Sequence, residues 1–75
     1  IAQVSGEVDR IFSGVERDAA LDQARQEAVR RAIEAGAEAS SVRTLDMEDI
    51  PIAYLPGNAR RIRIRVIGEI RPLGA

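Results

Sequence analysis

Three reactive residue types are missing from this 75-residue sequence, which contains no cysteine, no histidine and no lysine. Without cysteine there is no disulfide framework, thiolate metal site or thiol nucleophile. Without histidine the commonest general base and metal ligand is absent, and without lysine a Schiff base and a phosphate-clamping amine are excluded. We therefore expect no catalytic, cofactor-binding or metal-binding residue within this chain.

Aromatic side chains and long apolar runs are also scarce. Phe12 and Tyr54 are the only aromatic residues, so the core must be aliphatic. No stretch approaches the roughly 18 apolar residues that span a bilayer, and none has the layout of a signal peptide. We expect a cytoplasmic chain with no membrane partner. At this length only one small core is available, so residues 1–75 are expected to form a single domain.

A helical period runs through the middle of the sequence. From Glu16 to Ala35, small apolar residues recur every three or four positions among charged ones, which predicts an amphipathic helix. Gly36 is expected to end this helix. Ser13 with Glu16 has the spacing of a capping box at its start. The small alanine face suits close packing on a sheet.

Two segments on either side of this helix are expected to be strands. Val4–Ser13 alternates imperfectly, and Gly6 within it is a candidate β-bulge. Ser41–Met47 continues past Pro51 towards Tyr54. Because a proline cannot donate to a ladder, this second strand is expected at an edge of the sheet.

The cleanest alternation of apolar and charged residues follows a turn at Leu55–Asn58. It predicts a third strand with one buried face, which runs on towards Ile70. The apolar residues of this strand are expected to point inward, under the helix and towards Leu21, Ala28 and Ala32, and the charged residues are expected to point outward. The inward residues are Ile62, Ile64 and Val66, and the outward residues are Arg61, Arg63 and Arg65.

These elements predict an α+β fold, a two-layer β-α-β-β domain. The helix would join the first two strands in a right-handed crossover, and the third strand would return through a hairpin to the middle of the sheet. The expected result is a three-stranded mixed sheet in the order 1-3-2, covered on one face by one helix.

The outward arginines are the candidate interaction face: Arg61, Arg63 and Arg65. A basic strand face can follow a phosphate backbone. However, the formal net charge is −1 and stacking aromatics are missing, so nucleic acid is not expected as a partner. Asp46 and Glu48 could instead pair with the arginines across strands. We expect a solvated or protein-contacting face. The alternative is a free-standing module that binds anions or nucleic acid.

Two sets of polar residues invite a catalytic interpretation that the sequence does not favour. Asp46, Glu48 and Asp49 resemble a cation site, but such sites need oxygens from several segments, and pairing with arginine is the stronger interpretation. The serines at Ser5 and Ser40–Ser41 have no histidine or lysine base to activate them.

Two stretches of the sequence resemble a known family. IAQVSGEVDRIF (Ile1–Phe12) and IPIAYLPGNARRIRI (Ile50–Ile64) are similar to a C-terminal region of hydantoinase A-subunit and oxoprolinase-like proteins. The resemblance covers essentially the whole chain. The sequence departs from it at Val15–Arg17, where relatives carry a longer turn with a Ser or Thr cap.

The resemblance implies a parent enzyme rather than a site in this chain. The family comprises ATP-dependent ring-opening hydrolases of cyclic amides such as hydantoins and 5-oxoproline, built on an actin-like nucleotide-binding core. Its phosphate-binding motifs lie upstream and match no position here. We therefore expect an accessory domain of a longer protein, whose partner is the remainder of the parent chain or another subunit. ATP and a divalent metal would be bound only in the parent.

Overall fold

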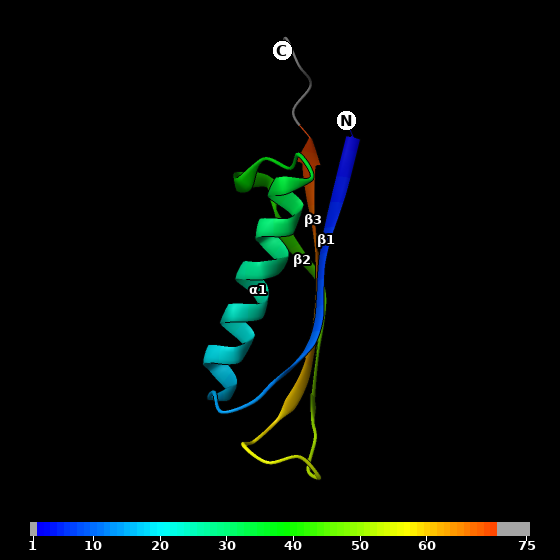
Figure 1. Cartoon of the computed structure of the whole chain (residues 1–75). Helices are drawn as coiled ribbons and strands as arrows, with labels where there is room; N and C mark the ends of the chain where they lie inside the picture. Colours follow the sequence, from blue (N-terminus) through cyan, green and yellow to red (C-terminus); the bar gives the residue numbers. More distant parts are fainter. Residues whose placement is uncertain (1, 71–75) are drawn as a thin grey trace.

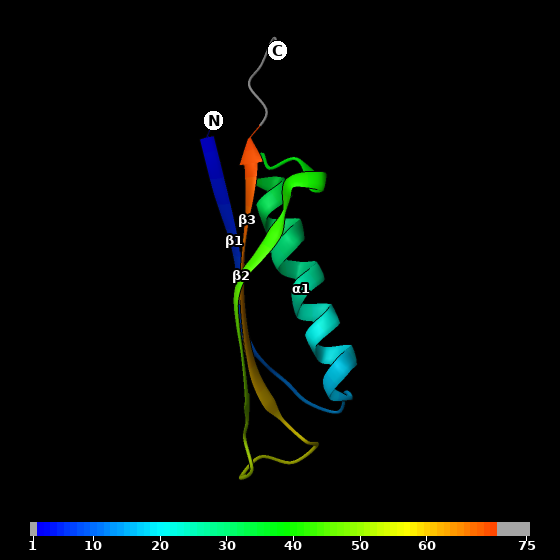
Figure 2. The same cartoon turned by 180° about the vertical axis from the view of Figure 1, so that it is seen from behind.

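An 18-residue helix lies along one face of a three-stranded sheet in a computed structural model that describes residues 2–70 (Figure 1). Figure 2 also shows the sheet edge-on, with α1 on one side and no helix or strand over the opposite, open face. The chain runs through β1 (Ala2–Phe12), α1 (Arg17–Glu34), the short 3₁₀ helix η1 (Ala39–Ser41), β2 (Arg43–Pro51) and β3 (Arg60–Ile70). This arrangement confirms the predicted two-layer α+β fold.

The strands lie in the predicted order, β1-β3-β2. Ile64 of β3 is opposite Val8 on one side and Met47 on the other, and both pairings are antiparallel. The sheet is therefore antiparallel rather than mixed, because β3 separates the two strands that run in the same direction. β2 lies at an edge, as its proline predicted, but it ends at Pro51 and does not continue towards Tyr54.

Gly6 is not a bulge. β1 pairs with β3 without a shift in register, and the irregularity in the sheet lies in β2 between Thr44 and Asp46. A Cβ on Gly6 would lie 2.2 Å from the carbonyl oxygen of Ala28 and 2.7 Å from the backbone nitrogen of Ala32. Glycine is needed here because the backbones of β1 and α1 approach each other closely.

The start of α1 differs in detail from the prediction. Glu16 is the N-cap residue, and its side chain makes no capping hydrogen bond, so the expected capping box with Ser13 is not formed. The backbone carbonyl of Glu16 accepts the first helical bond from the Ala20 N–H at 2.9 Å. Among residues 2–70, no helix is both long enough and apolar enough to cross a membrane.

The end of α1 is a Schellman motif. Gly36 has a φ of 113°, and its N–H donates to the Ile33 carbonyl at 2.9 Å. The Ala37 N–H donates to the Ala32 carbonyl at 3.0 Å. These bonds satisfy carbonyls that the helix end would otherwise leave free, so Gly36 ends the helix as predicted.

The core lies between the alanine face of α1 and the inward residues of β1 and β3. The helix contributes four fully buried alanines: Ala20, Ala24, Ala28 and Ala32. Ile62, Ile64 and Val66 are at most 1% exposed and belong to the same cluster, so their predicted direction is confirmed. Leu21 packs against this cluster partly buried. α1 packs on β1 and β3, whereas β2 contributes no buried residue.

Candidate functional site

The open face of the sheet carries the predicted row of arginines between carboxylates from both neighbouring strands. On the β1 side, Arg61 donates from Nε and Nη2 to the two carboxylate oxygens of Asp9, both at 2.8 Å. Arg63 donates from Nε to Glu7 Oε1 at 3.0 Å. These two acids were not predicted as partners, because the register of β1 against β3 is not encoded in either strand alone.

The predicted partners lie on the β2 side. Arg65 Nη2 donates to Asp46 Oδ2 at 2.9 Å, and Arg63 Nη1 lies 3.9 Å from Glu48 Oε1. Every arginine of the row therefore has at least one carboxylate partner. This pairing leaves little free positive charge for a phosphate backbone, because non-specific nucleic-acid binding depends on unpaired cations.

The hydrogen bonds on the β1 side also shift the pKa values of Asp9, Arg61 and Arg63. The hydrogen bond from Arg61 lowers the pKa of Asp9, partial desolvation opposes this, and the charges of Arg61 and Arg63 add to the lowering. The hydrogen bond to Asp9 raises the pKa of Arg61, and the one to Glu7 raises that of Arg63. Asp9 thus stays ionised to lower pH than a free aspartate.

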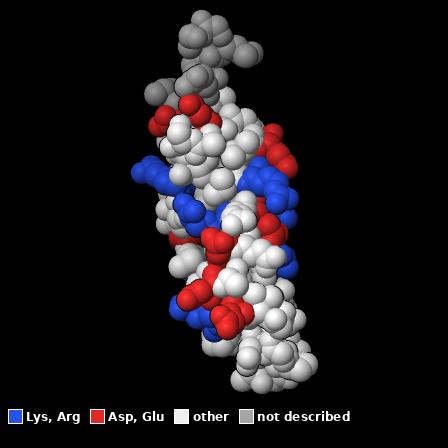
Figure 3. All heavy atoms as spheres, turned by 90° about the vertical axis from the view of Figure 1, so that its left-hand side faces the viewer, with Lys and Arg blue, Asp and Glu red and all other residues white. Residues whose placement is uncertain are grey.

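The helix-bearing side of the molecule also mixes charges. Figure 3 shows basic and acidic groups interspersed along it, with an uncharged end where the connection between β2 and β3 lies. Arg10 contributes to this pattern by donating from Nη2 to Glu27 Oε2 at 2.6 Å, and this hydrogen bond lowers the pKa of Glu27.

The acidic cluster of β2 does not converge on one point. Asp46 and Glu48 pair with arginines on the open face, whereas Asp49 contacts Arg17 at 2.7 Å and Arg60 at 2.8 Å. Within residues 2–70, no group of three acidic side chains is placed to hold a metal ion. The three carboxylates therefore serve separate ion pairs.

Ser41, one of the serines considered as a nucleophile, has a structural role. Its hydroxyl donates to the Glu38 carbonyl at 2.7 Å and accepts the Glu69 N–H at 2.8 Å. The hydroxyl thereby ties η1 to the end of β3.

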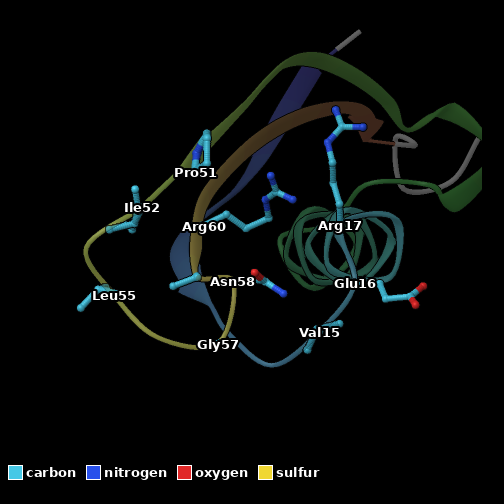
Figure 4. A pocket seen from close by; sticks show the side chains of 11 residues that line it. Val15, Glu16, Arg17, Pro51, Ile52, Leu55, Gly57, Asn58 and Arg60 are labelled. Carbon is cyan, nitrogen blue, oxygen red and sulfur yellow. The ribbon is translucent and has the colours of Figure 1, made fainter.

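A pocket that no sequence pattern indicated lies between the β2–β3 connection and the start of α1 (Figure 4). The pocket has a volume of about 560 Å³. A hydrogen bond of 2.7 Å from the Gly14 N–H to the Gly57 carbonyl joins its two sides. Its apolar lining is formed by Val15, Pro51, Ile52, Leu55 and Ala59. The turn at Leu55–Asn58 was predicted from the sequence. Its position beside residues 14–17 was not predicted, because it depends on how α1 packs on the sheet.

Two arginines of the lining, Arg17 and Arg60, share the carboxylate of Asp49, which does not itself line the pocket. Arg17 Nε donates to Asp49 Oδ2, and Arg60 Nε lies near Asp49 Oδ1 without the alignment of a hydrogen bond. The side chains of Asp49 and Arg60 are only 11% and 19% exposed. Asn58, whose φ is 52°, directs its amide towards the start of α1 (Figure 4).

Comparison of the sequence with protein-family models, with curated proteins and with solved structures finds no match. The fold defines the chain as a small two-layer α+β domain. The family suggested by the two similar stretches stays a prediction.

Proposed function

We propose that this chain is an accessory, non-catalytic domain of a hydantoinase/oxoprolinase-like enzyme and that it contacts the rest of that protein through β2. One structural observation supports the contact: α1 packs on β1 and β3 and leaves every residue of β2 outside the core. The proposed family is based on the resemblance of Ile1–Phe12 and Ile50–Ile64 to those enzymes.

β2 exposes three large apolar side chains. The exposed fractions are 47% for Leu45, 53% for Met47 and 49% for Ile50. Met47 lies opposite the buried Ile64, so it is on the same face as the helix. The charges, the irregularity and Pro51 of β2 protect its edge from pairing with other strands, but they leave these apolar side chains in solvent. A covering element from the parent protein would bury these side chains.

α1 adds a second exposed apolar area. Ile33 is 41% exposed and, with Val29, lines a shallow hollow of about 370 Å³. Charged side chains surround this hollow, including Arg25, Arg30 and Glu34. Apolar side chains within a polar rim are typical of a surface that another polypeptide covers.

The contact can be tested with Met47, the one methionine of the chain. Oxidation of its thioether by hydrogen peroxide depends on exposure and is measured by mass spectrometry. We expect fast oxidation in the 75-residue chain and oxidation about tenfold slower in the longer protein that contains it. Equal rates in the two proteins would show that nothing covers β2.

The proposed relation to cyclic amide hydrolases needs a separate measurement. ATP hydrolysis is followed with a panel of cyclic amides, for the 75-residue chain and for the longer protein. Turnover by the longer protein alone is expected. Turnover by the chain itself would contradict an accessory role, and a longer protein that is inactive on every cyclic amide would contradict the family.

A further inference from the structure

Two arginines line the wall of the pocket beside the β2–β3 connection. Arg17 and Arg60 share the carboxylate of Asp49, so two guanidinium groups meet one anion. Both approach it through Nε, and neither arginine donates a hydrogen bond from its Nη groups to residues 2–70. Glu16 is the one acid among the lining residues, and its carboxylate points away from Arg60 (Figure 4).

A second anion would be stabilised at this position. The Arg60 side chain is only 19% exposed, so water compensates its charge less well than at an open surface. Hydrogen bonds between guanidinium and carboxylate are roughly twice as strong as neutral ones and often form in parallel pairs. The free Nη groups of Arg17 and Arg60 are the donors for such bonds.

The remainder of the pocket suits a short apolar body. Ile52 and Leu55 of the β2–β3 connection lie on one side, and Val15 lies on the other (Figure 4). The volume of about 560 Å³ falls within the range of roughly 300–1,000 Å³ that is usual for small-ligand sites. The Asn58 amide adds a neutral donor and acceptor between the two sides.

We propose that this pocket binds an aliphatic carboxylate, with its charged group on Arg17 and Arg60 and its hydrocarbon against Ile52 and Leu55. One carboxylate is the counterion that the second of the two guanidinium groups sharing Asp49 lacks, whereas a phosphate dianion would bring more negative charge than that one group balances. The same chemistry is presented by a free short-chain acid and by a glutamate side chain of a neighbouring polypeptide. This inference does not depend on the family of the parent enzyme.

The test is a ¹⁵N NMR titration of the 75-residue chain with isovalerate. The signals followed are the backbone amides of Gly57 and Asn58 and the Nε–H groups of Arg17 and Arg60. Isovaleramide, which has the same shape without the charge, is the matched control, and sodium chloride controls for ionic strength. We expect saturable shifts with isovalerate at a Kd on the order of 1 mM, and binding of isovaleramide about tenfold weaker.

Two variants connect the binding to the arginines. Arg17→Gln should weaken binding about tenfold while the chain stays folded, because this side chain is largely exposed. Arg60→Gln should abolish binding, and if it unfolds the chain, Arg17→Gln decides alone. Glu16→Gln is the charge control and should not weaken binding.

The outcomes separate clearly. Absence of saturable shifts up to about 50 mM isovalerate, equal binding of isovaleramide, or unchanged binding in Arg17→Gln would each overturn the proposal. A second titration with N-acetylglutamate amide distinguishes the two sources of the ligand. Tighter binding of this compound than of isovalerate indicates a neighbouring polypeptide, and the reverse indicates a free acid.

Discussion

Gly6 of β1 lies so close to Ala28 of α1 that a Cβ on Gly6 would be 2.2 Å from the Ala28 carbonyl oxygen. This contact brings strand and helix backbones together. It explains why the buried face of α1 consists of alanines, since larger side chains would push the helix away from the sheet.

Gly6→Ala should therefore destabilise the domain by about 3 kcal/mol or more, because backbone atoms on α1 cannot move away cheaply. Urea denaturation measures the change. Gly14→Ala is the matched control: its Cβ would have no atom within 4 Å, so only its φ of 70° costs stability, roughly 1 kcal/mol. Similar losses in both variants would contradict the close approach.

The two faces of β3 should differ in their tolerance of truncation. Ile64 is 1% exposed, so Ile64→Ala should cost about 2–4 kcal/mol through lost burial and a cavity. Arg63→Ala removes exposed ion pairs and should cost less than about 1 kcal/mol. Denaturant melts compare the two variants. If Arg63→Ala loses as much stability as Ile64→Ala, the arginine row is buried against another part of a polypeptide and not solvated.

Arg31 should protect the outer edge of β1 from pairing with other chains. Its Nη1 donates to the Glu7 carbonyl at 2.5 Å, and thereby occupies a backbone acceptor on an edge strand. Arg31→Ala should increase self-association, measured by sedimentation velocity at several concentrations. The neighbouring Arg30→Ala is the control. If both variants remain equally monomeric, Arg31 has no protective role.

Acid should weaken the domain through Asp9. The pKa of Asp9 is lower in the folded chain than its ordinary value, so folding favours the ionised form. The resulting stability is present above the ordinary pKa and is lost as pH falls below about 4 through the lowered value. Glu27, bonded to Arg10, acts in the same direction.

Denaturant melts of the wild-type chain and of Asp9→Asn, from about pH 7 to about pH 2, measure this effect. The stability of Asp9→Asn should fall less steeply with acid, and added salt should reduce the difference between the two. Identical pH dependence in both proteins would mean that the pairing with Arg61 does not form in solution.

Sequence alone determined the elements whose signal is local. The helix predicted from Glu16 to Ala35 spans Arg17–Glu34, because its alanines repeat with the period of the backbone. The inward direction of Ile64 followed from alternation along one strand, and the edge position of β2 followed from the missing donor of Pro51.

Only the tertiary structure decided which distant residues meet. The role of Gly6 depends on where α1 crosses β1, and the pairing of Arg61 with Asp9 depends on a register that neither strand specifies by itself. The sharing of Asp49 by Arg17 and Arg60 joins three separate segments at one pocket. Such contacts arise from the packing of whole elements, which residue spacing within one element does not encode.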